Sequence, residues 1–151
     1  MDELKYEIYI AGSLEEVWGA LTAPHQVAKI YYGSVIHSTF KEGDPLEYIG
    51  PGKDGDQTLH VYGTLLEFSP NRAFRYTHKV GPSYLENPNA DSPESRISWL
   101  LETVGGSTKL TLIHDEWKPG DPSYNGSKSA WPMIISNIKT LVETGRTLDF
   151  S

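Results

Sequence analysis

The sequence predicts an α+β protein in which a curved antiparallel sheet packs against one long helix at the C-terminal end. Three observations predict this class. A helical apolar stripe lies near the end of the chain, apolar residues alternate with period two through the middle, and two short helical segments follow the first strand. A helix with one apolar face needs a cover, and a sheet with one apolar face can supply it.

The long helix is predicted over residues 129–145, because apolar residues recur there at offsets of 3, 4 and 7. The stripe consists of Trp131, Ile134, Ile135, Ile138, Leu141 and Val142. The opposite side carries the polar residues Ser136, Asn137, Lys139, Thr140 and Glu143. Pro132 is expected in the first turn, so Ser127 or Ser129 is the predicted N-cap. Gly145 is expected just beyond the last turn.

Two short helices are predicted after a first strand at residues 5–11. Ser13 and Glu16 have the spacing of a capping box, which predicts that the first helix begins there. Pro24 suits the first position of a second helix, which extends through residue 32 and is stopped by a glycine.

The middle of the chain reads as a meander of strands, because sequential hairpins give an antiparallel sheet. Strands are predicted over residues 34–40, 45–49, 58–68, 73–80, 95–104 and 108–117. Gly63 is expected to mark a bulge or a close approach of two backbones. Residues 81–94, which contain three prolines, form the longest irregular segment and are a candidate lid over a binding site.

Composition limits the possible functions. The 151 residues are predicted to form a single domain, 1–151, that carries a net charge of −7 and contains no cysteine. A nucleic-acid partner is disfavoured because the chain is acidic, and disulfides or thiolate metal sites are excluded. No run approaches the roughly 20 apolar residues of a membrane span. Without a recognisable signal peptide, a cytoplasmic protein is predicted, either a monomer or a homodimer.

Three strings in this order resemble a known family. They are Val17-Trp18-Gly19-Ala20-Leu21-Thr22-Ala23-Pro24, the hairpin strand 106–114, and the closing helix 136–145. Together they resemble the helix-grip fold of the START and birch-pollen-allergen superfamily, also called SRPBCC. Within it, the chain is similar to the branch named after the C-terminal domain of the heat-shock-protein-90 ATPase activator. Ile30-Tyr31-Tyr32 departs from the pattern, since the family often has tryptophan after the second helix.

The resemblance implies a cavity between the sheet and the closing helix, which superfamily members use for lipids, polyketides, flavonoids or hormones. It implies no shared catalytic residue, so none is assigned. The predicted function is therefore binding of a small hydrophobic or aromatic molecule without a cofactor. A co-chaperone-like module with a chaperone partner remains an alternative, which the family name alone suggests.

Strand alternation predicts which side chains face this cavity. In the strand 58–68, His60, Tyr62 and Leu66 are assigned to the inner face unless Gly63 bulges. The predicted ligand-binding residues are Tyr62, Tyr76, His78, Trp99, His114, Trp131, Ile135 and Ile138. Apolar walls with a few hydroxyl and imidazole groups fit an aromatic ligand with polar substituents. The alternative is a filled core in which the same polar groups bond to one another.

Two kinds of chemistry are weaker alternatives. Three of the strand histidines, among His37, His60, His78 and His114, could in principle hold zinc, but no local spacing supports a metal site. A cyclase or hydrolase that uses His78 or His114 as acid or base is also conceivable. Glu116 would share a face with His114 at this spacing, although an exposed rim pair is the favoured interpretation.

Overall fold

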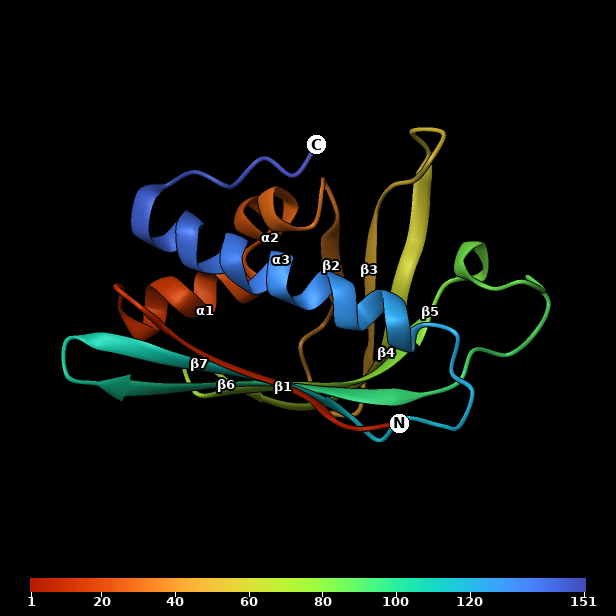
Figure 1. Cartoon of the computed structure of the whole chain (residues 1–151), viewed down its shortest axis with the longest axis horizontal. Helices are drawn as coiled ribbons and strands as arrows, with labels where there is room; N and C mark the ends of the chain where they lie inside the picture. Colours follow the sequence, from red (N-terminus) through yellow and green to blue (C-terminus); the bar gives the residue numbers. More distant parts are fainter.

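A computed structural model describes residues 1–151 and shows a curled sheet with three helices on one side of it (Figure 1). The elements in chain order are β1 (Leu4–Ile10), α1 (Leu14–Thr22), α2 (Pro24–Ile30), β2 (Val35–Ser38), β3 (Pro45–Pro51), β4 (Gln57–Ser69), β5 (Ala73–Val80), the 3₁₀ turn η1 (Pro82–Tyr84), β6 (Ser95–Val104), β7 (Ser107–Asp115) and α3 (Tyr124–Thr144).

The sheet has seven antiparallel strands in the order β1-β7-β6-β5-β4-β3-β2 and does not close. The first strand pairs with the last, with Leu4 opposite His114, so β1 and β2 are the two open edges of the sheet. α3 lies along the concave side, with its first half over β3 to β5 and its second half beside α1 (Figure 1). This is the predicted α+β helix-grip architecture.

The local signals at the first two helices are confirmed. Ser13 Oγ accepts from the Glu16 backbone N–H at 3.1 Å, and Glu16 Oε1 accepts from the Ser13 N–H at 3.0 Å. Pro24 occupies the first turn of α2, where its missing N–H breaks no helical bond, but α2 ends at Ile30 and not at residue 32 as predicted. None of the helices is both long and apolar enough to cross a membrane.

The predicted start of the long helix is wrong, because α3 begins at Tyr124 with Ser123 as its N-cap. Pro132 therefore lies inside the helix, where it removes one backbone hydrogen bond. Upstream, Asp121 Oδ1 accepts from the Ser123 N–H at 2.9 Å and holds the new start. The chain thereby gains five residues of helix, about one and a half turns, over the sheet.

The sequence pattern placed Asn137 on the polar side of α3, which was expected to face solvent, but this side is partly buried. Asn137 is buried, and its Oδ1 accepts from the Leu148 N–H at 2.7 Å. This bond draws the C-terminal tail back along the helix, as Figure 1 shows. The hydrogen bond explains why an amide can be buried on this side of the helix.

β4 does not alternate as predicted. Its pairing with β3 skips His60 and its pairing with β5 skips Leu66, so the two irregularities flank Gly63 rather than coincide with it. Leu65 is consequently buried, whereas Leu66 is exposed, and Val61 takes the inner position expected for Tyr62. Gly63 is a close-approach point, since a Cβ there would lie 1.9 Å from the Thr77 carbonyl oxygen.

Candidate functional site

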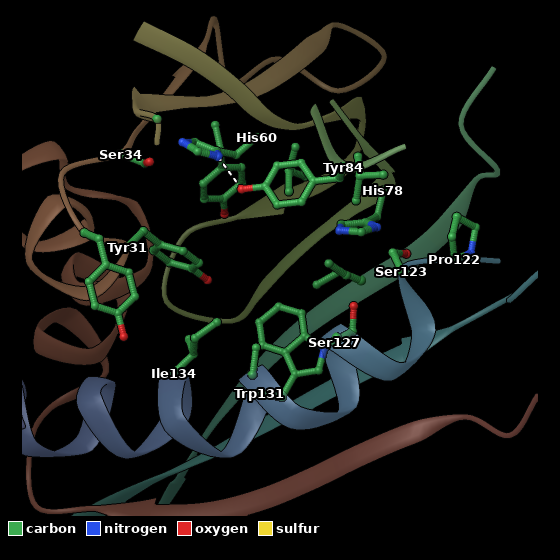
Figure 2. A pocket seen from close by; sticks show the side chains of 18 of the residues that line it. Tyr31, Ser34, His60, His78, Tyr84, Pro122, Ser123, Ser127, Trp131 and Ile134 are labelled. Atoms are coloured by element: carbon green, nitrogen blue, oxygen red, sulfur yellow. Dashed lines mark hydrogen bonds between the residues drawn. The ribbon is translucent and has the colours of Figure 1, made fainter. Parts of the chain in front are cut away.

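A cavity of about 600 Å³ lies between the sheet and the first half of α3. The strands β3 to β6 supply one wall, and α3 supplies the other through small or apolar side chains. The α3 wall consists of Gly126, Ser127, Ala130, Trp131 and Ile134. Figure 2 shows Trp131 and Ile134 rising from the helix, with Tyr31 and His78 on opposite sides of the space. The cavity thus has an apolar middle and two polar ends.

Tyrosine hydroxyls form one end. The Tyr48 and Tyr76 hydroxyls are 3.1 Å apart, and the Trp99 indole N–H donates to Tyr76 at 3.4 Å. Tyr31 packs on Tyr48 with 5.2 Å between ring centroids. Burial raises the pKa of Tyr76 to about 12, and it raises the pKa of Tyr31 and Tyr48 well above the usual 10. These groups are therefore neutral phenols near neutral pH.

A chain of hydrogen bonds forms the other end. The Trp131 indole Nε1–H donates to His114 Nδ1 at 3.0 Å, and His114 Nε2 lies 2.7 Å from Ser95 Oγ. Ser95 Oγ in turn lies 3.3 Å from His78 Nδ1. His78 lines the cavity, while Ser95 and His114 lie behind it and are buried.

Both histidines are held neutral. Burial lowers the pKa of His78 to about 4, although the nearby Asp121 carboxylate opposes the shift. Burial, together with His78, lowers the pKa of His114 to about 2. A neutral imidazole carries one donor and one acceptor, so this end offers polarity without charge.

At the mouth of the cavity, Tyr84 and His60 contact each other. The Tyr84 hydroxyl bonds to His60 Nδ1, as Figure 2 shows, and His60 Nε2 lies 3.1 Å from the Pro51 carbonyl oxygen. Since a carbonyl can only accept, Nε2 carries the proton and the Tyr84 hydroxyl donates to Nδ1. Tyr84 belongs to η1, so the irregular segment 81–94 does contribute to the site.

The predicted site residues divide into three groups. Tyr76, His78 and Trp131 line the cavity. Trp99 and His114 lie one layer behind and bond to residues that line it. Ile135 and Ile138 are buried in the core outside the lining.

Tyr62 lies outside the cavity, which corrects its predicted inward orientation. It pairs with Lys79 across the strands, and the Lys79 Nζ lies 6.0 Å from its ring centroid. The irregularity at His60 shifts the alternation by one residue, so Tyr62 turns away from α3.

Several residues of the site, in the lining or directly behind it, were not among the predicted ones. Tyr48 alternates inward on β3, and Tyr31 marks the departure from the family pattern after α2, so both had a sequence signal. Ser95 had none, because a serine at the start of a strand becomes informative only when His78 and His114 are placed beside it.

The metal site and the Glu116–His114 pair gain no geometric support. No three histidine, aspartate or glutamate side chains converge in a way that could hold a metal ion. Glu116 follows the end of β7 with a φ of +57° and pairs with Arg96 at 3.5 Å. Its carboxylate is exposed whereas His114 is fully buried, so the two do not share a face.

Fold and cavity together define a helix-grip protein with an internal site under its closing helix. The sequence matches the family model described as "Activator of Hsp90 ATPase homolog 1-like protein" over residues 11–143. The chain belongs to this family. No curated protein matches it in sequence.

Solved structures share the fold at low identity. Protein MLL2253 from Mesorhizobium loti is 20% identical with a TM-score of 0.73, over 93% of this chain and 96% of that one. The Aha1 dimer from Colwellia psychrerythraea is 20% identical with a TM-score of 0.69, over 96% and 98%. DynU16, a protein of the dynemicin biosynthetic locus, is 19% identical with a TM-score of 0.74, over 97% of this chain and 49% of DynU16.

Proposed function

We propose that the protein binds a planar, largely apolar molecule, of the polyketide or flavonoid type, in the cavity under α3. The observation that carries this proposal is a space of about 600 Å³ whose middle is apolar and whose two ends carry neutral polar groups. Pockets of roughly 300–1,000 Å³ with apolar walls and few polar groups are typical of small-molecule sites.

The chemistry of the walls favours a flat aromatic ligand over a flexible acyl chain. The Trp131 and Tyr31 rings supply rigid contact area at little cost in side-chain entropy. No carboxylate lines the cavity, and the one ordinarily charged lining residue, Lys53, is exposed at the mouth. A ligand with a buried charge would therefore lack a buried partner.

A thermal-shift screen tests this proposal with flavonoids, polyketide-like phenols and fatty acids. Flat aromatic compounds are expected to raise the melting temperature, because they bind only the folded protein. Ala130→Trp should abolish the shift by filling the space, whereas Met133→Trp, on an exposed position of the same helix, should leave it intact. If no compound class stabilises the protein, the proposal is wrong.

A cyclase- or hydrolase-like activity is a second candidate, because the neutral His78 borders the cavity and could exchange a proton with a bound molecule. DynU16, from a biosynthetic locus, shares the fold. One variant, His78→Phe, distinguishes an enzyme from a binding protein. An enzyme would lose turnover in His78→Phe while it still bound its substrate, whereas a binding protein shows no turnover in either form.

A further inference from the structure

The indole of Trp131 sets the positions of the protons in the histidine end of the cavity. An indole N–H can only donate, so His114 Nδ1, 3.0 Å away, must accept. A neutral imidazole has one proton, and in His114 that proton is therefore on Nε2. His114 Nε2–H then donates to Ser95 Oγ at 2.7 Å.

The direction in which the Ser95 hydroxyl donates determines which nitrogen of His78 carries its proton. Its two candidate acceptors are His78 Nδ1 at 3.3 Å and the His78 carbonyl oxygen at 3.5 Å. Both distances exceed the usual range of an O–H···O bond, about 2.5–3.0 Å, and Nδ1 is the nearer acceptor. The hydroxyl is thus assigned to Nδ1, and the single proton of His78 resides on Nε2.

His78 Nε2 has no hydrogen-bond partner in the protein. The ring lines the cavity and points into it beside Ser123 in Figure 2. Its Nε2 is not sealed off from solvent, so a ligand in the cavity can reach it. An N–H in that position is a fixed donor, because the nitrogen behind it is already occupied.

The tyrosine end also has hydrogens to offer. Trp99 donates to Tyr76, so the Tyr48 and Tyr76 hydroxyls share one hydrogen between them and leave the other free. A second oxygen on the ligand could accept that hydrogen.

We infer that the cavity selects planar conjugated ketones or quinones, whose carbonyl oxygen accepts the hydrogen bond of His78 Nε2–H. This inference rests on the proposed function and specifies its ligand class. His78 determines specificity, while Ser95, His114 and Trp131 act as positioning residues that hold its tautomer. Hydrocarbons of the same shape fill the same space but leave the N–H without a partner.

The matched probes are 9-fluorenone and fluorene, which share a flat tricyclic skeleton and differ by one carbonyl oxygen. In ligand-observed NMR titrations, the wild-type protein should bind fluorenone about 2- to 13-fold more tightly, the range that corresponds to one net neutral hydrogen bond. In His78→Phe the preference should disappear, and in His78→Gln the amide N–H should restore part of it. Equal affinity of the wild-type protein for both probes would overturn the inference.

Ser95→Ala tests the positioning role. If Ser95 had only a structural role, Ser95→Ala would lower the affinity for both probes equally. If Ser95 fixes the tautomer of His78, the variant loses only the preference for fluorenone over fluorene. The ¹⁵N shifts of His78 in the unaltered protein provide a test without any variant. A protonated Nε2 is expected, and a protonated Nδ1 overturns the inference.

The outcomes separate the two proposals. If both probes bind equally in every form, the carbonyl preference is wrong and the binding function stands. If neither probe binds and the broader screen also fails, the binding function itself is wrong. A fluorenone preference that survives in His78→Phe assigns the donor elsewhere and overturns the role of His78.

Discussion

The two halves of α3 cover the same sheet but do different things. From Ile135 onward the helix packs without space, with Ile138 fully buried and α1 alongside. A Cβ on Gly12 would lie 2.5 Å from Val142 Cγ1, so the chain leaves no gap there. In the first half, Ser127 and Ala130 are small, and Ile134 is only half-buried over the cavity.

Anchoring differs between the halves as well. The second half is held to the end of β1 by two bonds, since Glu143 Oε2 accepts from the N–H of Ala11, just after the strand, at 2.8 Å, and Lys139 Nζ donates to the Tyr9 carbonyl at 2.7 Å. The first half is held by the Trp131 bond to His114 and by the Tyr124 hydroxyl, which donates to the Asp2 carbonyl oxygen at 3.1 Å. One continuous helix can therefore stabilise the fold at one end and leave room for a ligand at the other.

The largest expected effect comes from removing packing in the second half. Ile138→Ala should lower the free energy of unfolding by about 2–5 kcal/mol, because it opens a cavity in a filled core. Ile134→Ala should lower it by about 1 kcal/mol or less, since its side chain already borders open space. Urea denaturation measures both, and equal losses would contradict the division of the helix.

Acid should destabilise the protein through the cavity half. The folded pKa values of His78 and His114 are depressed from 6.5 to about 4 and about 2, so the unfolded chain takes up protons first as pH falls. Stability present above pH 6.5 should therefore be lost below it, by about 1.4 kcal/mol per pH unit for each histidine.

Urea unfolding between pH 7.5 and 5 measures this slope. His114→Gln should make it shallower, whatever that substitution does to stability at pH 7.5. An unchanged slope would mean that other groups account for the acid sensitivity.

The tyrosine end should tolerate some deletions and not others. Tyr76→Phe leaves the buried Trp99 N–H without its acceptor, which should cost about 1–3 kcal/mol. Tyr31→Phe removes a hydroxyl that has no partner in the protein, so its effect should be smaller than about 0.5 kcal/mol. Thermal unfolding of the two variants compares them directly, and similar melting temperatures would argue against the Tyr76 network.

The smallest difference concerns the helix caps. Ser13→Ala should cost about 1 kcal/mol, because the Ser13 hydroxyl caps α1 at the packed half. Ser123 makes no side-chain cap on α3. Its hydroxyl donates to Asp121 Oδ1 at 2.7 Å, but the Ser123 N–H donates to the same oxygen and is kept in Ser123→Ala, so this variant should cost less. Chemical denaturation decides between them, and a greater loss for Ser123→Ala would contradict the assignment of the caps.

Local patterns in the sequence determined the architecture. The Ser13–Glu16 capping box, the alternation in the strands and the stripe from Trp131 to Val142 each report on neighbours a few residues apart. Such signals suffice to predict the order of the elements, the α+β class and the pairing of a closing helix with a sheet. They also predicted Tyr76, His78 and Trp131 at the cavity, because these residues alternate or repeat regularly.

Only the tertiary structure decided the details of the site. The irregularities at His60 and Leu66 arise from pairing with two neighbouring strands, so alternation alone misplaced Tyr62. The early start of α3 depends on contacts that overcome the cost of Pro132. The chain from Trp131 to His78 joins residues from α3, β7, β6 and β5. No local pattern encodes it, because hydrogen bonds between distant segments exist only once the sheet has paired and the helix has closed over it.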